Sequence, residues 1–208
     1  ASMFLSLDGV DGAGKSTQIQ LLRDWLREQN HDVVTCRDPG STQLGEDVRG
    51  ILLGHHDTPV GMRSEMLLYM AARAQLVEEV IRPALDSGKV VVCDRYLLAN
   101  VVYQGYAGGL DVEDLWSVGR VATGELEPAC TFVLDMPPED SLARLSGQPD
   151  RMEKRGLEFM TRVRKGFLTE AQRQPECIRV VDARGTIDHI HAEIRKHVSQ
   201  LLMTGGAS

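Results

Sequence analysis

Long apolar runs and an excess of positive charge are both missing from this 208-residue sequence. Its longest uncharged apolar runs have about five residues, whereas a membrane-spanning helix needs roughly 20. Lysine and arginine total 23 against 30 aspartates and glutamates, which gives a net charge of −7. Proteins that bind nucleic acids usually carry a basic surface instead. We therefore expect neither a membrane nor a nucleic acid among the partners, although a local cationic pocket for a small anion remains compatible with this charge.

Cysteine is scarce and never closely paired. No C-x-x-C pair occurs, so neither a zinc site nor a disulfide framework is indicated, and we predict reduced thiols in a cytoplasmic protein. The first residues lack a basic segment followed by a long apolar one, which argues against a signal peptide. We interpret Ala1-Ser2 as a remnant ahead of a natural start at Met3. The four cysteines are Cys36, Cys93, Cys130 and Cys177.

The sequence does contain an alternation of two hydrophobic patterns. Short β-rich runs alternate with longer stretches that have helical spacing. The short runs lie at 4–7, 33–35, 90–93, 131–134 and 178–181. The helical stretches lie at 15–28, 44–53, 64–85, 112–123, 139–145, 153–171 and 187–202. Short apolar strands between amphipathic helices are typical of a parallel sheet that is covered on both faces. We therefore predict a single α/β domain over residues 3–203, with loops at 38–42, 104–109 and 146–150 and a frayed tail at 204–208.

The first predicted strand leads directly into a glycine-rich segment that matches G-x-x-x-x-G-K-[ST]. Its glycines let backbone N–H groups surround an anion, and the following helix adds its positive N-terminal end. Lys15 can then reach the β- and γ-phosphates, and the Ser16 hydroxyl can ligate Mg²⁺. The motif predicts binding of a nucleoside triphosphate with Mg²⁺. Its expected contacts are Gly9, Asp11, Gly12, Ala13, Gly14, Lys15, Ser16 and Thr17.

The motif alone does not distinguish a switch GTPase from a mechanical ATPase or a kinase. The guanine-reading pattern N-K-x-D is absent from the sequence, and the D-x-x-G at 47–50 falls within a predicted helix rather than after a strand. These two observations argue against a GTPase. They leave the ATPase and kinase alternatives open.

A second anion site is suggested at the end of the third predicted strand, where Asp94 and Arg95 follow an apolar run. The carboxyl ends of strands in open α/β sheets face the ligand crevice. Asp94 could hold Mg²⁺ there, and the Arg95 guanidinium could bridge donor and acceptor phosphates. The alternative is a structural Asp–Arg pair that caps the strand.

The motifs around this position resemble those of thymidylate kinases. Asp94-Arg95-Tyr96 followed by Asn100 and 103–105 (Y-Q-G) is similar to the family's D-R-[YH]…Y-Q-G signature. Residues 37–49 resemble its R-E-P-G-G-T…R stretch, 68–75 its F-x-A-A-R-x-Q helix, and 150–153 its lid segment D-R-x-E. The resemblance covers about residues 4–197, and the motifs occur in family order.

The resemblance implies a fold and an activity. The fold would be that of P-loop nucleoside monophosphate kinases, with a five-stranded parallel sheet and a lid at about 144–156. The activity would be transfer of the ATP γ-phosphoryl group to dTMP, giving dTDP and ADP, with Mg²⁺ as cofactor and a homodimer as the usual assembly. Two alternatives are another P-loop nucleoside monophosphate or deoxynucleoside kinase, and a nucleotide-binding protein without catalytic activity.

The same resemblance assigns roles around the acceptor nucleotide. Arg49 and Arg95 would hold the dTMP phosphate, while Tyr69 would stack on the base and Arg73 would donate to thymine O4. The remaining acceptor-side roles fall to five further residues. Asn100 and Gln104 would read the other thymine edge, Tyr103 would pack on the deoxyribose, Asp11 would lie near the sugar and Mg²⁺, and Asp38 near the reaction centre, where the family usually carries Glu.

Catalytic cations on the donor side would come from the lid. Gly12 stands where some thymidylate kinases carry an arginine, so this chain resembles the bacterial type with lid arginines. Arg151 is the best candidate and Arg155 a second, unless both belong to a solvated helix face. The resemblance places Arg144, Asp182 and Arg184 around the adenine. The predicted catalytic group is Lys15, Asp94, Arg95 and Arg151.

Overall fold

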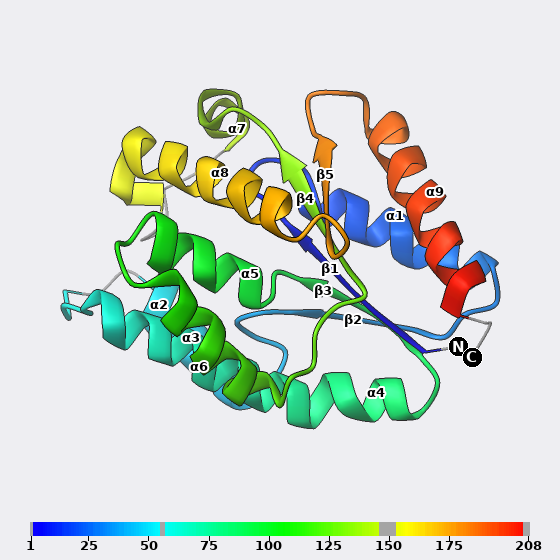
Figure 1. Cartoon of the computed structure of the whole chain (residues 1–208), viewed down its shortest axis with the longest axis horizontal. Helices are drawn as coiled ribbons and strands as arrows, with labels where there is room; N and C mark the ends of the chain where they lie inside the picture. Colours follow the sequence, from blue (N-terminus) through cyan, green and yellow to red (C-terminus); the bar gives the residue numbers. More distant parts are fainter. Residues whose placement is uncertain (1, 55–56, 146–152, 206–208) are drawn as a thin grey trace.

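The computed structural model describes residues 2–54, 57–145 and 153–205, built around one five-stranded sheet (Figure 1). All strand pairs are parallel, and the order is β2-β3-β1-β4-β5. This confirms the predicted parallel α/β architecture. The strands are β1 (Met3–Asp8), β2 (Val33–Arg37), β3 (Val90–Asp94), β4 (Cys130–Asp135) and β5 (Ile178–Asp182).

Helices cover both faces of the sheet because alternate strand residues point in opposite directions. Leu5 and Val92 belong to one apolar core, whereas Phe4 and Val91 belong to another on the opposite face. The first core is completed by α1 (Lys15–Glu28), α8 (Gly156–Arg173) and α9 (Ile187–Gly205). The second is completed by α3 (Met62–Leu76), η1 (Val77–Ile81), α4 (Arg82–Asp86), α5 (Leu97–Asn100) and α6 (Val112–Thr123).

The remaining elements lie around the carboxyl ends of the strands (Figure 1). Among them, α2 packs on α3, and the π-helical segment η2 continues α5 and packs on α6 and α8. These elements therefore form the walls above the sheet edge at which β1, β2 and β3 end. Their bounds are α2 (Gln43–Leu53), η2 (Val101–Tyr106), α7 (Pro138–Arg144) and η3 (Glu153–Arg155).

The helix predicted at 64–85 is longer and less regular than its pattern indicated. It begins at Met62, changes to π-helical geometry at Val77–Ile81 and ends at Asp86. Pro83 lies one residue after the start of α4. Proline cannot donate a backbone hydrogen bond and its ring clashes with the preceding turn, so the wider π turn accommodates it without ending the helix.

Two predicted boundaries are wrong. Residues 104–106 were expected in a loop but are helical, because η2 extends to Tyr106. This segment is buried almost throughout, so it lacks the polar face by which a helix is usually recognised. Thr204 and Gly205, expected in a frayed tail, belong to α9, and the Thr204 hydroxyl donates to the Gln200 carbonyl. The loop predicted at 146–150 lies outside the described residues.

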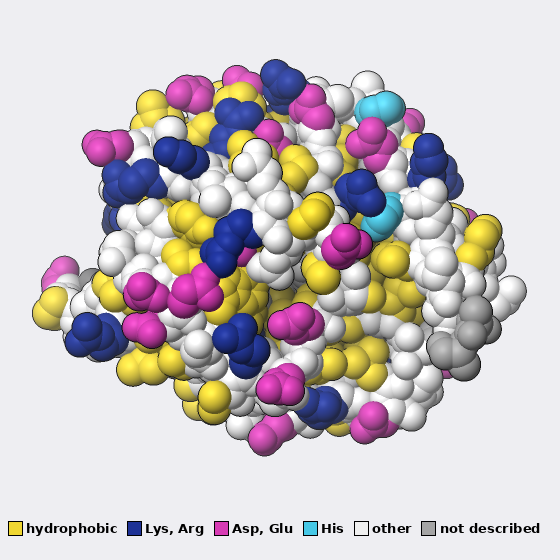
Figure 2. Space-filling model, in the orientation of Figure 1, with side chains coloured by type: hydrophobic (Ala, Val, Ile, Leu, Met, Phe, Trp, Pro, Cys, Tyr) yellow, Lys and Arg dark blue, Asp and Glu magenta, His cyan; other side chains and the backbone are white. Residues whose placement is uncertain are grey.

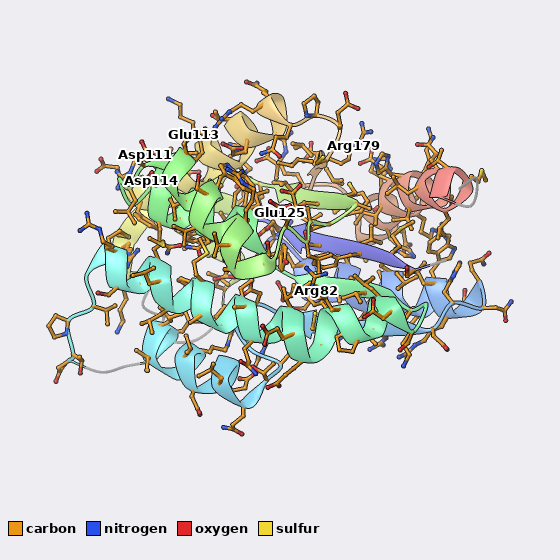
Figure 3. All side chains as sticks on the ribbon, turned by 60° about the horizontal axis from the view of Figure 1, so that its bottom comes forward. Arg82, Asp111, Glu113, Asp114, Glu125 and Arg179 are labelled. Atoms are coloured by element: carbon orange, nitrogen blue, oxygen red, sulfur yellow. The ribbon has the colours of Figure 1, made fainter. Side chains whose placement is uncertain are left out.

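Helix α6 is capped at both ends by charged residues (Figure 3). At its start the Asp111 carboxylate accepts from the Asp114 backbone N–H at 2.9 Å, and Glu113 also lies in the first turn. Beyond its end, Arg82 of α4 donates to the Gly124 carbonyl at 2.7 Å. Acidic groups at the start and a cation at the end complement the helix dipole. The hydrogen bond from Arg82 therefore ties the end of α6 to α4.

The surface drawn in Figure 2 carries basic and acidic side chains interspersed, without a broad area of one sign on that face. The four cysteines are all free; Cys177 is exposed and the other three are buried. No helix in the described part of the chain combines the length and the apolar character that crossing a bilayer requires.

Candidate functional site

Two adjoining cavities lie at the carboxyl ends of β1, β2 and β3. The smaller has a volume of about 80 Å³ and the larger about 430 Å³. Four residues line both: Asp11, Asp38, Arg49 and Arg95. The smaller cavity is further lined by Pro39, Leu53, Tyr69, Arg73, Ala99, Asn100, Tyr103 and Gln104. The larger is further lined by Gly12, Gly14, Lys15, Ser16, Thr17, Arg37, Asp94 and Arg144.

The glycine-rich loop reaches its shape because two positions exclude side chains. Gly9 has φ 132°, and a Cβ there would lie 2.5 Å from the Leu134 carbonyl oxygen. Gly12 has φ 84°, and its Cβ would lie 2.5 Å from the Ser141 carbonyl oxygen. Both contacts are with backbone and cannot be relieved by a side-chain rotation. Position 12 therefore cannot carry an arginine in this loop.

Lys15 begins α1 and is 7% exposed. Its Nζ donates to the Gly9 carbonyl at 3.2 Å and lies 3.5 Å from Asp11 Oδ1. Burial and the nearby Arg95 lower the pKa of Lys15, while the surrounding carboxylates oppose that change. The lysine is held beside the larger cavity by groups that an anion can replace.

Arg95 pairs with the acidic residues of the first strand and the loop, not with its neighbour Asp94 as the strand-capping alternative required. Its NH2 donates to Asp11 Oδ1 at 2.9 Å, and its NH1 lies 3.4 Å from Asp8 Oδ1. The guanidinium lies over the Tyr103 ring, 5.3 Å from its centre. Arg95 has φ 66°, a left-handed backbone that turns the chain directly after β3. This turn directs the side chain toward both cavities.

The two carboxyls that contact Arg95 ionise differently. Full burial raises the pKa of Asp8 to about 7 despite Arg95 and Lys15. For Asp11 burial also opposes ionisation, but Arg95 and Lys15 outweigh it and lower the pKa to about 2. The Oδ2 atom of Asp8 is buried without a hydrogen-bond partner among the described residues. The sequence pattern gave Asp8 no role; its burial and its contact with Arg95 identify it as part of the site.

Arg73 lines the smaller cavity and is 1% exposed. Its Nε donates to Asp38 Oδ2 at 2.5 Å, its NH1 to Asn100 Oδ1 at 3.0 Å, and its NH2 to the Tyr96 carbonyl at 3.4 Å. This excludes an exposed position on the helix surface. Asp38 Oδ1 is buried without a hydrogen-bond partner in the described part of the chain.

Sequence reasoning missed Glu65 of α3, which is fully buried. Its Oε1 accepts from Gln104 Nε2 at 2.7 Å, and its Oε2 accepts from Arg155 NH2. Gln104 Oε1 in turn accepts from Asn100 Nδ2 at 2.6 Å. Glu65 lies on a helix that also carries Arg63, Ser64 and Gln75, so the sequence offered no distinct signal for it.

The predicted lid and adenine residues have different positions. Arg155 is bound to Glu65 and is 20% exposed, so it is not a solvated side chain. Arg144 is exposed and lines the larger cavity. Asp182 and Arg184 pair with each other at 2.8 Å, are exposed and line neither cavity. Arg151 lies outside the described residues.

The aromatic residues close the smaller cavity on two sides. Tyr103 packs against Phe159 and Phe167 of α8, at ring-centre distances of 6.3 Å in both cases, and burial raises its pKa well above the usual range. Tyr69 of α3 is half-buried and also lines the cavity. Arg49 of α2 lies between the two cavities, and its NH1 donates to the Pro39 carbonyl at 3.1 Å.

Comparison with known proteins is consistent across sequence and structure. The family model described as thymidylate kinase matches residues 7–194. The thymidylate kinase of Symbiobacterium thermophilum is 45% identical over 202 residues, which cover 97% of this chain and 94% of that protein. That of an Exiguobacterium species is 43% identical, with 99% and 98% covered. The crystal structure of thymidylate kinase from Ehrlichia chaffeensis has a TM-score of 0.78 at 31% identity, covering 95% of this chain and 99% of that one.

Proposed function

This chain belongs to the thymidylate kinase family, which phosphorylates dTMP to dTDP with ATP, and we propose that its two cavities divide the two substrates between them. The larger cavity, at the glycine-rich loop, would hold the ATP phosphates. The smaller cavity would hold the thymine nucleotide. The observation that carries this assignment is the shared wall of Asp11, Asp38, Arg49 and Arg95, because a phosphoryl group can pass only between adjoining sites.

On the donor side, backbone N–H groups of the loop and the start of α1 would bind the β- and γ-phosphates. Lys15 would exchange its contacts with the loop for the phosphate oxygens and so offset the charge that develops during transfer. Gly12 leaves no room for an arginine, which supports the proposal that the lid at 144–156, with Arg151, supplies a further cation. Arg144, Asp182 and Arg184 would contact the adenine side.

On the acceptor side, Arg49 and Arg95 would bind the dTMP phosphate, and Arg73 would donate to thymine O4. Asn100 and Gln104 would read the adjacent edge of the base, which would stack on Tyr69. Tyr103 would exclude a 2′-hydroxyl from its side of the sugar. The unpartnered Asp38 Oδ1 needs a donor, and a hydroxyl of the acceptor or a water molecule provides one.

Mg²⁺ would be held by the Ser16 hydroxyl and the Asp94 carboxylate, which both line the larger cavity. Among the described residues no group of three His, Cys, Asp or Glu side chains is arranged to hold a metal. One carboxylate and one hydroxyl nevertheless fit a metal that binds mainly to substrate phosphates. When bound, Mg²⁺ would neutralise charge on the transferring phosphoryl group.

The assembly is proposed to be a homodimer. The layer formed by α2 and α3 exposes Leu44, Ile51 and Leu67, which are 45%, 44% and 50% exposed. Large apolar side chains gathered on one layer are typical of an interface. A molar mass near twice that of the 23.0 kDa chain is expected in light scattering. A mass that stays at that of a single chain across the micromolar range contradicts this.

An acceptor panel tests the proposed division. With ATP and Mg²⁺, we expect dTMP to be the best acceptor, dUMP to be weaker, and AMP, dCMP and thymidine to react at least about 100-fold more slowly in kcat/KM. Thymidine lacks the phosphate that Arg49 and Arg95 would bind. Turnover of thymidine equal to that of dTMP would indicate a deoxynucleoside kinase, and preference for AMP or dCMP would indicate another nucleoside monophosphate kinase.

A further inference from the structure

A continuous row of largely buried polar side chains runs from η3 to the shared wall of the two cavities. Arg155 donates to Glu65, which accepts from Gln104, which accepts from Asn100. Asn100 accepts from Arg73, and Arg73 donates to Asp38. Every member except Arg155 is at most 3% exposed. The row therefore exchanges few hydrogen bonds with water.

The two ends of this row determine the orientation of the two amides within it. A carboxylate only accepts hydrogen bonds, so Gln104 must present its NH₂ group to Glu65, and its oxygen then faces Asn100. Asn100 must in turn present its NH₂ group to Gln104, and its own oxygen faces Arg73. A guanidinium only donates, so that last contact is satisfied as well. Only this orientation satisfies every contact between neighbouring members of the row.

This orientation matters for the base because Asn100, Gln104 and Arg73 all line the smaller cavity. Thymine presents the acceptor O4 beside the donor N3–H, whereas cytosine presents an amino donor beside the acceptor N3. Arginine donors beside amide oxygens with a free lone pair match the first pattern and not the second. A buried donor facing another donor is costly, because neither group can turn to water.

We propose that Glu65, held by Arg155, is a positioning residue that fixes the amides of Gln104 and Asn100 and thereby sets the preference for thymine over cytosine. The inference rests on the proposed assignment of the smaller cavity to dTMP. Glu65 does not line that cavity, so it acts through Gln104. The buried carboxylate keeps its place because Arg155 offsets its charge.

The substitution Glu65→Gln tests the proposal directly. The amide that replaces the carboxylate would turn its oxygen to Arg155 and its NH₂ group to Gln104, which forces both amides of the row to reverse and sets the NH₂ of Asn100 against Arg73. We expect the ratio of kcat/KM for dTMP to that for dCMP to fall by at least about tenfold, with KM for ATP changed less than about twofold. An unchanged ratio in the folded variant would overturn the proposal.

Glu170→Gln is the matched control. Glu170 is also fully buried, binds Arg173 as Glu65 binds Arg155, and also accepts from η2. Its partner on η2 is the Tyr106 hydroxyl, which can rotate to accept instead of donate. We expect a loss of stability in this variant without a change in the dTMP-to-dCMP ratio. The same fall of the ratio in both variants would reduce Glu65 to a structural residue.

Two further variants keep the test decisive. If Glu65→Gln does not fold, the double variant E65M/R155M removes both charges, a change that buried ion pairs often tolerate. A methionine in place of Glu65 offers no strong acceptor to Gln104, so the ratio should again fall at least about tenfold.

Asn100→Ala separates the proposed role of Glu65 from the proposed assignment of the smaller cavity to dTMP. If it impairs dTMP use and E65M/R155M does not, only the role of Glu65 is wrong; if it leaves dTMP use unchanged, the assignment of the cavity is wrong.

Discussion

The two cavities are held in shape by different kinds of contact. In the smaller cavity the side chains are bonded to one another, from Arg73–Asp38 to Asn100 and Gln104. In the larger cavity the shape comes from loop backbone, and Lys15 makes only long contacts with that loop. On the proposed assignment, the base would be selected by an arrangement that already exists, whereas the phosphates would be bound by charges that exchange partners when a ligand arrives.

The largest effect is expected in the larger cavity, where charged groups would exchange partners when a ligand binds. Lys15→Met keeps the length of the side chain but removes its charge, and we expect kcat/KM for ATP to fall by about 10³-fold. Binding of dTMP to the variant should change less than about threefold, measured by calorimetry without ATP. An equal loss of dTMP binding would mean that the two cavities do not work separately.

A smaller but more selective loss is expected in the smaller cavity, where the side chains are hydrogen-bonded to one another. Arg73→Gln removes the central donor, so KM for dTMP should rise about 100-fold while KM for ATP stays within about threefold. Arg164→Gln breaks a two-bond pair with Asp135 that lines neither cavity and serves as the control. If Arg73→Gln raises both KM values alike, Arg73 does not read the base.

Stacking should contribute less than the hydrogen bonds. Tyr69→Ala removes a ring face from the smaller cavity, and we expect kcat/KM for dTMP to fall about tenfold. Tyr69→Phe keeps the face and should change it less than about threefold. Steady-state kinetics with dTMP as the varied substrate measure both. A larger loss in Tyr69→Phe than in Tyr69→Ala would show that the ring does not act by stacking.

The smallest effect concerns the stability contributed by Asp8, which contacts Arg95 from the end of β1. The pKa of Asp8 is raised from 3.8 to about 7, so between these values the folded protein holds a proton that the unfolded chain has released. Stability is therefore lost as the pH rises through this window. Asp8→Asn cannot ionise, so its Tm relative to the parent should increase by several °C from about pH 5 to about pH 8 in thermal unfolding. A difference that is constant with pH would contradict the burial of a titrating Asp8.

The same contrast explains how much the sequence could predict. The glycine-rich loop and the Asp94-Arg95 turn are local, so their residues and their place at strand ends follow from contiguous motifs. The strands and most helices follow from their period. The helical structure of residues 104–106 could not be predicted in this way, because a helix that is buried on all sides shows no polar face. The π turn before Pro83 also left no separate signal in the sequence.

Contacts between segments that are far apart in the sequence could not be predicted from it. Glu65 and Arg155 are 90 positions apart, and Arg73 and Asp38 are 35 apart. A buried charge in an apolar helix predicts that a partner exists but does not identify it. The pairing of Arg95 with Asp8 and Asp11 was missed for the same reason, since it depends on how β1 and β3 lie side by side.

Calorimetric titration of dTMP and of dCMP into the nucleotide-free enzyme tests most directly whether the base cavity is assembled in advance. We expect dTMP to bind without ATP and with a Kd at least about tenfold below that of dCMP. Equal affinities for the two nucleotides, or binding of dTMP that appears only when an ATP analogue is present, would contradict this account.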